Sequence, residues 1–290
     1  MTDGPATLRV ATWNIRAAIG PEKPFPDRWW RLIDAGRLHA IGEFLAGIDA
    51  DVVALQEVAL VSRDGALLDN AGDLARQLGM DVRYGATRTF GAAAPDGTVI
   101  GAGCFGNAIL SRLPISSSRA AMLPTAPADA LIEPAGSSAE GAGMRYRDAP
   151  EWFREPRTVL VADVAGTAFV STHLSHRGSG ERALQAAATV DAVADARAAL
   201  VLADLNAPIE ARELAAFAGW TDGFAVAGVP PGDERRVSTD DQFMLDHVLG
   251  RGVGVSGCRV VRESAELSDH YPVVAEISID SADAAPLPNR

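Results

Sequence analysis

Residues 200–206 read Leu-Val-Leu-Ala-Asp-Leu-Asn, an apolar run that ends in two polar side chains. Consecutive apolar residues are typical of a strand that is covered on both faces. A carboxylate beside such a strand is costly unless it is paired with another group or bound to a metal. The polar residues at the end of this strand therefore indicate a functional site beside a buried strand.

Similar apolar runs recur along the chain and predict further strands. They lie at residues 8–13, 52–55, 107–110, 158–161 and 168–171, with a short strand near 115–122. Between them, apolar residues at helical spacing predict three helices: one that reaches Ile48 after an N-cap at Asp27, one over 68–78 and one over 181–196. Strands that alternate with helices indicate an α/β or α+β sandwich.

The length of 290 residues is enough for a sizeable core. We expect one catalytic domain over residues 1–279. Residues 114–156 are rich in Pro and Gly and are predicted to form a long surface excursion. Residues 280–290 are polar and are predicted to be a flexible tail.

The chain carries 38 acidic and 26 basic side chains, a net charge of -12, and its single lysine is Lys23. This balance disfavours non-specific binding to nucleic acids or anionic membranes, although a local basic cleft stays compatible with it. Cys104 and Cys258 are too few for a disulfide framework. We expect a cytoplasmic protein without a membrane span, because no signal peptide is visible and no apolar run approaches roughly 20 residues.

Polar residues also follow other predicted strands. Asn14, Glu57 and His173 each close a predicted strand, and Asp246 and Asp269-His270 stand near the C-terminus. Oxygen ligands without cysteine favour Mg²⁺, Mn²⁺ or Ca²⁺ over a thiolate zinc site. Histidines together with an Asp-x-Asn suit phosphoryl chemistry, which needs a base for water and donors for the phosphate oxygens.

Six short motifs, in this order, resemble those of the endonuclease/exonuclease/phosphatase superfamily. They are Thr12-Trp13-Asn14-Ile15, Leu55-Gln56-Glu57-Val58, Gly106-Asn107-Ala108-Ile109-Leu110-Ser111-Arg112, Thr172-His173-Leu174, Ala203-Asp204-Leu205-Asn206-Ala207 and Ser268-Asp269-His270-Tyr271-Pro272-Val273. The resemblance covers about residues 8 to 279. It implies a four-layer sandwich, in which two mixed β-sheets face each other and helices flank them.

The resemblance also implies a metal site and its ligands. Glu57 resembles the principal carboxylate ligand of Mg²⁺ or Mn²⁺, with Asn14 and Asp269 as nearby or water-mediated ligands. Asn107 is expected either to reach the phosphate of the substrate or to hold the floor of the site.

The same resemblance assigns roles in the reaction. Asp204 resembles the residue that orients or deprotonates the attacking water, and Asn206 the donor to the developing phosphorane. His270 resembles the histidine at the scissile phosphate, and Asp246 the buried carboxylate that orients it. His173 stands where the apurinic-endonuclease branch typically has Tyr and the phosphatase, sphingomyelinase, deadenylase and pancreatic-type deoxyribonuclease branches have His.

Two positions depart from the pattern of the family. Ala203 stands where Gly is most frequent, and His247 stands where Tyr often follows the buried Asp. Ala203 keeps a small side chain, so we expect little effect there. The second departure weakens the assignment of Asp246.

We therefore expect a metal-dependent hydrolase of phosphoric esters, either a phosphodiesterase or a phosphatase, in which activated water attacks in line. A small phosphate ester or a nucleotide-type substrate is favoured. A nuclease is the first alternative, but it needs a basic or aromatic track for nucleic acid. A non-catalytic binding module is the second.

Other polar and aromatic residues have less definite roles. Arg182 and Gln185 are expected to support the rim of the sheet. Trp29 and Trp30 are expected to take part in helix packing and not to form a base-stacking platform. A cluster in and after the excursion could bind an anionic part of the substrate or form a solvated face: Arg145, Arg147, Trp152, Arg154 and Arg157.

Overall fold

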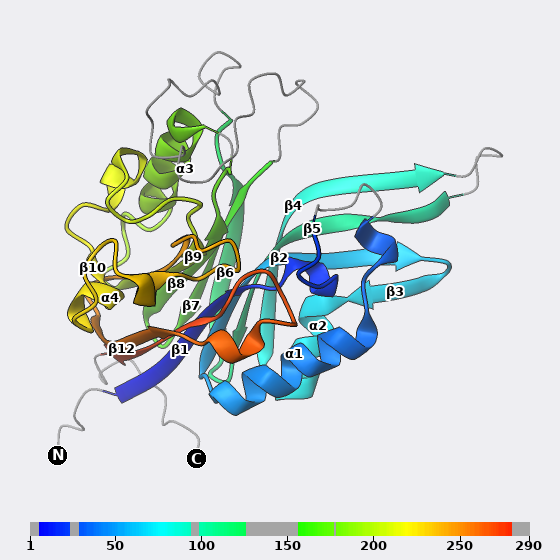
Figure 1. The fold of residues 1–290 in the computed structure, drawn as a ribbon, viewed down its shortest axis with the longest axis horizontal. Coiled ribbons are helices and arrows are strands. Elements are labelled where there is room, and N and C mark those ends of the chain that lie inside the picture. The colour runs from blue at the N-terminus through cyan, green and yellow to red at the C-terminus, as the bar shows by residue number, and fades with distance from the viewer. Residues whose placement is uncertain (1–5, 24–28, 94–98, 126–155, 177, 280–290) are drawn as a thin grey trace.

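The structure is a computed structural model that describes residues 6–23, 29–93, 99–125, 156–176 and 178–279. Its strands form two sheets (Figure 1). The first sheet contains, in spatial order, β12 (Gly254–Val260), β13 (Val273–Ile279), β1 (Ala6–Asn14), β2 (Val52–Arg63), β5 (Val99–Ser111) and β4 (Asp81–Ala93), with β3 (Ala66–Asp69) paired to β2.

The second sheet contains β10 (Thr221–Asp222), β11 (Asp246–Arg251), β9 (Ala199–Asp204), β8 (Thr167–His173), β7 (Thr158–Val164) and β6 (Ile115–Met122), in that order. Both sheets are mixed. The pairs β1–β2 and β8–β9 are parallel, whereas the neighbouring pairs β1–β13 and β9–β11 are antiparallel.

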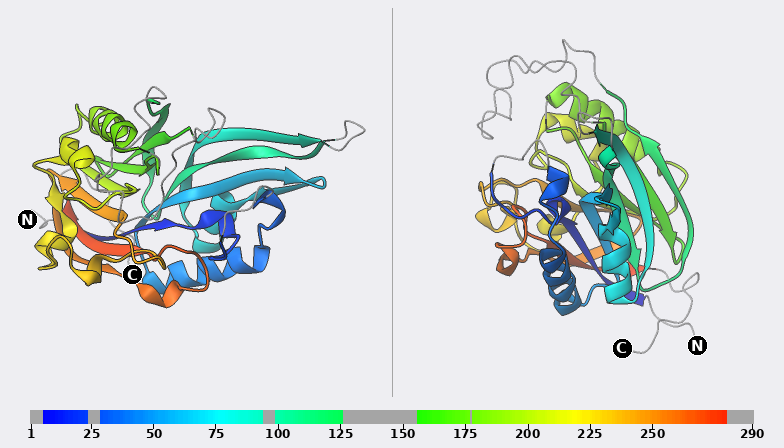
Figure 2. Two further views of the ribbon diagram at one scale, coloured as in Figure 1. Left: turned by 45° about the horizontal axis from the view of Figure 1, so that its top comes forward. Right: turned by 90° about the vertical axis from the view of Figure 1, so that its right-hand side faces the viewer.

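Apolar side chains fill three layers between and outside the sheets. Val52 and Ala54 of β2 join Leu200 and Leu202 of β9 in the core between the sheets. The alternate residues of β2 pack instead under α1 (Ala35–Ile48) and α2 (Asn70–Leu78), while α3 (Ser179–Asp191) covers the second sheet (Figures 1 and 2). The strands read as continuous apolar runs because both of their faces are covered. The predicted sandwich of two facing mixed sheets with outer helices is confirmed.

The first predicted helix begins later than expected. Asp34, not Asp27, is the N-cap of α1: its side chain accepts a hydrogen bond from the backbone N–H of Arg37 at 2.7 Å. Asp27 lies outside the described residues. Trp29 and Trp30 belong to a short 3₁₀ turn, η2 (Trp29–Arg31), and their rings pack against Phe90. Their apolar spacing therefore reflects packing against the sheet. It does not mark a helix that continues into α1.

The other predicted boundaries differ less. The helix expected over 68–78 is α2, with Asp69 as its N-cap and Gly79 in the left-handed conformation at its end. The helix expected up to Ala196 ends at Asp191 and continues as turns. The strand near 115–122 is β6, but the rest of the proposed excursion, from 126 to 155, and the tail 280–290 lie outside the described residues.

Within the described residues, we find no helix that combines the length and the apolar character needed to cross a bilayer.

A buried ion pair fixes α3 next to the end of β8. Nη2 of Arg182, in α3, lies 2.8 Å from Oε1 of Glu213, in η6 (Arg212–Phe217). Both side chains are almost fully buried. Arg182 also donates to the carbonyl of Ser175, and the Gln185 side chain accepts from the N–H of Ser175. Arg182 and Gln185 thus support the segment that follows His173, as the sequence predicted.

Replacing Glu213 with Leu should lower the free energy of unfolding by about 3–5 kcal/mol, because it leaves a buried guanidinium without its carboxylate. Urea unfolding measures the change. The matched control is the double variant Arg182→Met/Glu213→Leu, which removes both charges and should recover most of the loss. A single variant within about 1 kcal/mol of the wild type would contradict the ion pair's role.

Candidate active site

The strand pairing brings polar side chains from the two sheets to one edge. In the second sheet, His173, Asp204 and Asp246 are in register on three neighbouring strands. In the first sheet, Asn14 ends β1 and pairs with Gln56 of β2. These residues are far apart in the chain, and the parallel pairs place their carboxyl ends on the same side.

Asp204 lies at the centre of the cluster and is 1% exposed. Its Oδ2 accepts a hydrogen bond from Asn14 Nδ2 at 3.2 Å and lies 3.3 Å from His173 Nε2 and 3.8 Å from His270 Nε2. Its Oδ1 accepts from the backbone N–H of Asn206 at 3.0 Å. One carboxylate therefore contacts groups from both sheets.

Glu57 reaches the cluster because β2 has a bulge. The register shifts between Leu55 and Val58, and Glu57 takes a left-handed backbone conformation with φ 53°. Such a conformation costs of order 1–3 kcal/mol for a residue other than Gly, and bulges redirect side chains at functional sites. Glu57 Oε1 accepts from Asn14 Nδ2 at 3.2 Å and lies 3.8 Å from His173 Nδ1.

His270 and Asp246 form a short pair, with Nδ1 of the imidazole 2.8 Å from Oδ2 of the carboxylate. The backbone of His270 is also held, since Trp13 Nε1 donates to its carbonyl at 2.9 Å. Asp246 is fixed through its own N–H, which donates to Ser238 Oγ at 3.1 Å. His247, the departure from the family's pattern, points elsewhere and lies 2.9 Å from the carbonyl of Ala207.

Burial and charge separate the protonation states of the three central groups. Burial raises the pKa of Asp204 to about 6, with Asp246 adding to the shift and His270 opposing it. Burial alone would lower the pKa of His270, but Asp246 and Asp204 outweigh it and raise that pKa well above its usual value. Burial, followed by the charge of Arg157, lowers the pKa of His173 well below its usual value. At neutral pH the site then holds an imidazolium, a neutral imidazole and a carboxylate, which suit different roles.

Asn206, Asp269 and Asn107 take different positions around this centre. Asn206 has a left-handed backbone, φ 51°, and donates one amide hydrogen to the carbonyl of Leu174 at 2.9 Å. Asp269 is connected to Asn14 through Ser268, whose Oγ donates to the carbonyl of Asn14 at 2.8 Å and lies 3.4 Å from Asp269 Oδ1. Asn107 is buried, and its amide donates to the carbonyl of Thr158 in the other sheet at 2.8 Å. This contact favours the second role predicted for Asn107, that of holding the floor.

Two supporting residues were not predicted as part of the site. Gln56 is fully buried, and its Nε2 lies within 3.2 Å of Thr12 Oγ1, Ser171 Oγ and the carbonyl of Leu202, so it joins the sheets behind Asp204. In the sequence, the signal that could have identified Gln56 was a polar amide next to an apolar strand. Arg16 is the other, and its buried guanidinium lies beside Asp269. Among the predicted arginines near the excursion, Arg157 is buried with Nη2 3.2 Å from His176 Nδ1, whereas residues 145–154 lie outside the described part of the chain.

The donors of the cluster fit a hard divalent cation. Oxygens of Glu57 and Asp204, from different sheets, meet at the Asn14 amide, and the site contains oxygen and imidazole groups without a thiol. Atoms of Asp204, Asp246 and His270 also lie within 4.8 Å of one another, but a protonated His270 donates hydrogen bonds and does not ligate a cation. Asn14 turns its NH₂ toward the carboxylates, while its Oδ1 accepts from the N–H of Arg16. In this orientation the oxygen of Asn14 reaches a cation only through a water or after the amide turns over.

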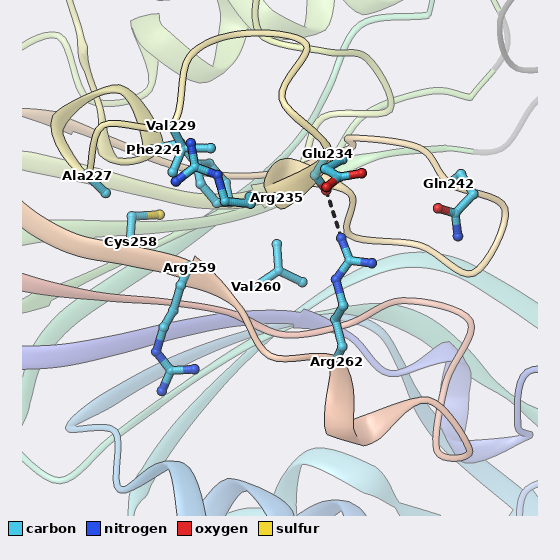
Figure 3. Close-up of a pocket in the computed structure, with 10 residues that line it drawn as sticks. All are labelled: Phe224, Ala227, Val229, Glu234, Arg235, Gln242, Cys258, Arg259, Val260 and Arg262. Atoms are coloured by element: carbon cyan, nitrogen blue, oxygen red, sulfur yellow. Dashed lines mark hydrogen bonds between the residues drawn. The ribbon is translucent and has the colours of Figure 1, made fainter.

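A separate cavity of about 570 Å³ lies between η7 (Glu234–Arg236), α4 (Gly223–Val226) and β12 (Figure 3). Its arginines point in different directions. Arg235 pairs with Asp233, Arg262 donates to the carbonyl of Glu234, and Arg259 extends away from both. Residues of the Asp204 cluster do not line this cavity.

His247 is buried and gives a test of pH dependence. Burial lowers its pKa. An unfolded histidine, with a pKa of about 6.5, gains a proton below that pH while the folded one resists it, so this group's contribution to stability is complete above pH about 6.5 and falls as the pH drops. His247→Gln should remove up to about 1.4 kcal/mol per pH unit of this slope below pH about 6.5, measured by urea unfolding at several pH values. Identical slopes in the two proteins would contradict the prediction.

The chain matches known proteins in both sequence pattern and fold. Residues 11–270 match the model of the Endonuclease/Exonuclease/phosphatase family. An endonuclease/exonuclease/phosphatase structure from Beutenbergia cavernae shares 21% identity over 94% of this chain and 72% of that one, with a TM-score of 0.65. No curated protein sequence matched.

Two further solved structures have related folds. The mannosyl-6-phosphatase of Bacteroides thetaiotaomicron aligns over 94% of this chain and 100% of its own, with 17% identity and a TM-score of 0.56. A humanized TDP2 from D. rerio aligns over 94% of this chain and 99% of its own, with 15% identity and a TM-score of 0.58. At such identities these likenesses establish the fold and leave the substrate open.

Proposed function

Since the chain belongs to the endonuclease/exonuclease/phosphatase family, whose members hydrolyse phosphoric esters, we propose that it hydrolyses small phosphate esters or nucleotides with Mg²⁺ or Mn²⁺. The observation that carries the proposal is the set of contacts around Asp204. A buried carboxylate receives a hydrogen bond from Asn14 and lies within 4 Å of two histidines whose pKa values are shifted in opposite directions. A base, a cationic donor and a neutral imidazole around one point suit in-line attack of water on phosphorus.

The proposed roles follow from the protonation states. Asp204, ionised at neutral pH, orients the attacking water and accepts its proton. His270, protonated and held by Asp246, donates to an oxygen of the phosphate. The amide hydrogen of Asn206 that is not directed at Leu174 serves the developing phosphorane, and neutral His173 provides one further N–H.

Glu57 and Asp269 would hold the cation, with Asn14 beside them. A divalent cation at this place supplies charge compensation for the phosphate and lowers the pKa of a bound water. The excess of acidic groups around Asp204 needs such compensation before an anionic substrate can enter.

Small substrates are favoured by the charge of the chain. A net charge of -12 with a single lysine opposes long polyanions more than it opposes a compact phosphate whose charge a cation offsets locally. Nucleic acid cleavage uses the same site and is the competing outcome. A cytoplasmic location remains part of the proposal.

A screen of phosphomonoesters, phosphodiesters, nucleotides and oligonucleotides, each with Mg²⁺ and with Mn²⁺, tests the function. We expect turnover of at least one small ester and weak action on oligonucleotides. Preferred cleavage of oligonucleotides, with steeply salt-dependent binding, would favour a nuclease. Absence of turnover in every arm would favour a binding module.

A further inference from the structure

The turn that follows β1 has an unusual backbone. Arg16, Ala17 and Ala18, which form η1 (Arg16–Ala18), have φ values of 46°, 51° and 59°. Three successive residues other than Gly in the left-handed region are strained, and such strain concentrates at functional sites. Burial of both alanines, together with the hydrogen bond from the N–H of Ala18 to the carbonyl of Ile15 at 2.9 Å, keeps the turn in place.

The turn places the guanidinium of Arg16 in the interior beside Asp269. Its side chain is 4% exposed, and Nε lies 3.4 Å from Asp269 Oδ2. Nη1 donates to the carbonyls of Gly20 at 2.8 Å and Glu22 at 2.7 Å. A buried guanidinium with these contacts cannot move without losing charge-assisted hydrogen bonds.

Arg16 thereby touches two of the residues proposed to surround the cation. Its backbone N–H donates to Asn14 Oδ1 at 3.0 Å and so sets which face of that amide meets the carboxylates. Its guanidinium fixes one oxygen of Asp269, while Ser268 lies beside the other. The side chain of Arg16 thus orients Asp269, and its backbone N–H holds Asn14.

A second tie joins the same loop to the backbone of Asp269. Lys23, the single lysine of the chain, pairs with Asp240 at 3.0 Å and also contacts Asp241. The N–H of Asp240 donates to the carbonyl of Asp269 at 3.0 Å. The segment 15–23 therefore holds Asp269 through its side chain and, by way of Asp240, through its backbone.

We propose that Arg16 is a positioning residue of the cation site, whose guanidinium orients Asp269 for a hard divalent cation. The inference rests on the proposed function. Groups that orient metal ligands commonly change metal affinity by about 10–100-fold when they are removed. Because the side chain of Arg16 acts through Asp269, its loss should weaken the binding of the cation more than it slows turnover at saturating cation.

Another buried arginine offers a matched control. Arg236 pairs with Asp222 at 2.7 Å, and its Nε donates to the carbonyls of Val229 at 3.0 Å and Pro230 at 2.9 Å. It repeats the pattern of one carboxylate and two loop carbonyls but lies outside the Asp204 cluster. If Arg16 were merely structural, its substitution would change Mn²⁺ affinity no more than the same substitution at Arg236.

The test is calorimetric titration of the full chain with Mn²⁺ in the absence of substrate, together with kcat, KM and thermal unfolding. Arg16→Met should bind Mn²⁺ about 10–100-fold more weakly than the wild type and regain most of its kcat at saturating Mn²⁺. Arg236→Met should lose stability with unchanged Mn²⁺ affinity. Arg16→Lys retains the charge but cannot span Asp269 and both carbonyls, so it should recover only part of the affinity and serves as the readout if Arg16→Met does not fold.

Each outcome is decisive. Wild-type Mn²⁺ affinity in folded Arg16→Met, or in Arg16→Lys if that alone folds, would overturn the positioning role and leave the proposed function standing. A wild-type protein that binds no Mn²⁺ and hydrolyses no phosphate ester would overturn the proposed function, and this inference with it.

Discussion

Asp204→Asn should lower kcat for a phosphate ester by about 10³-fold, with KM changed far less, because the amide cannot accept the proton of the attacking water. The substitution keeps the size of the side chain, and the hydrogen bond from the N–H of Asn206 can persist. We therefore expect the folded state to survive. Steady-state kinetics at saturating Mn²⁺ measures the effect.

The control for Asp204→Asn is Asp195→Asn, which removes one negative charge from an exposed position in the turns after α3. It should leave kcat unchanged. Asp204→Asn with more than about a tenth of wild-type kcat would contradict the assignment of Asp204 as the base, since general-base catalysis contributes about 10²–10⁴-fold.

Removal of divalent cations should have an effect of similar size. Protein treated with EDTA and then freed of the chelator should lose turnover by about 10³-fold or more, because the cation contributes several kcal/mol of charge stabilisation. The carboxylates of Glu57 and Asp204 lie close together around Asn14, so the site without a cation repels an anionic substrate. Addition of Mg²⁺ or Mn²⁺ should restore activity.

Glu57→Gln links this requirement to a residue. It removes the charge of the main proposed ligand while retaining an oxygen, so half-maximal activity should need about 10-fold or more Mn²⁺. Full turnover in protein shown by elemental analysis to lack divalent metal would contradict a cation-dependent mechanism.

The sequence predicted the architecture because its signals are local. Apolar runs such as 200–203 and 168–171 are buried on both faces, and each became a strand of the second sheet. The start of α1 was predicted less well, since Trp30 and Ile33 have helical spacing but pack in a separate cluster under β2. An apolar period alone does not tell a helix from a turn held against a sheet.

The candidate site was predicted from strand ends, and the structure brings six of its residues into mutual contact: Asn14, Glu57, His173, Asp204, Asp246 and His270. Asp246, in doubt because His247 follows it, lies 2.8 Å from His270. The sequence could not predict how these residues are supported, because that depends on contacts between distant segments. Three such contacts join parts of the chain separated by more than 40 residues. They are the bulged pairing of β2 with β5 at Glu57, the cross-sheet amide of Gln56, and the guanidinium of Arg16 beside Asp269.

The orientation of Asn14 shows the same limit. Its place at the end of β1 followed from the motif, but the direction of its amide is set by the left-handed turn at Arg16. That turn contains no glycine to signal it, and strained residues other than Gly are not predicted by local propensity.

The central claim is that water activated at Asp204 attacks phosphorus. Its most direct test is hydrolysis of a phosphate ester in ¹⁸O-labelled water with Mn²⁺, followed by ³¹P NMR and mass spectrometry of the products. Attack at phosphorus predicts one ¹⁸O in the phosphate product, none in the released alcohol, and little product of any kind from Asp204→Asn. Label in the alcohol, or no hydrolysis by the wild type with Mn²⁺ or Mg²⁺, would contradict the account.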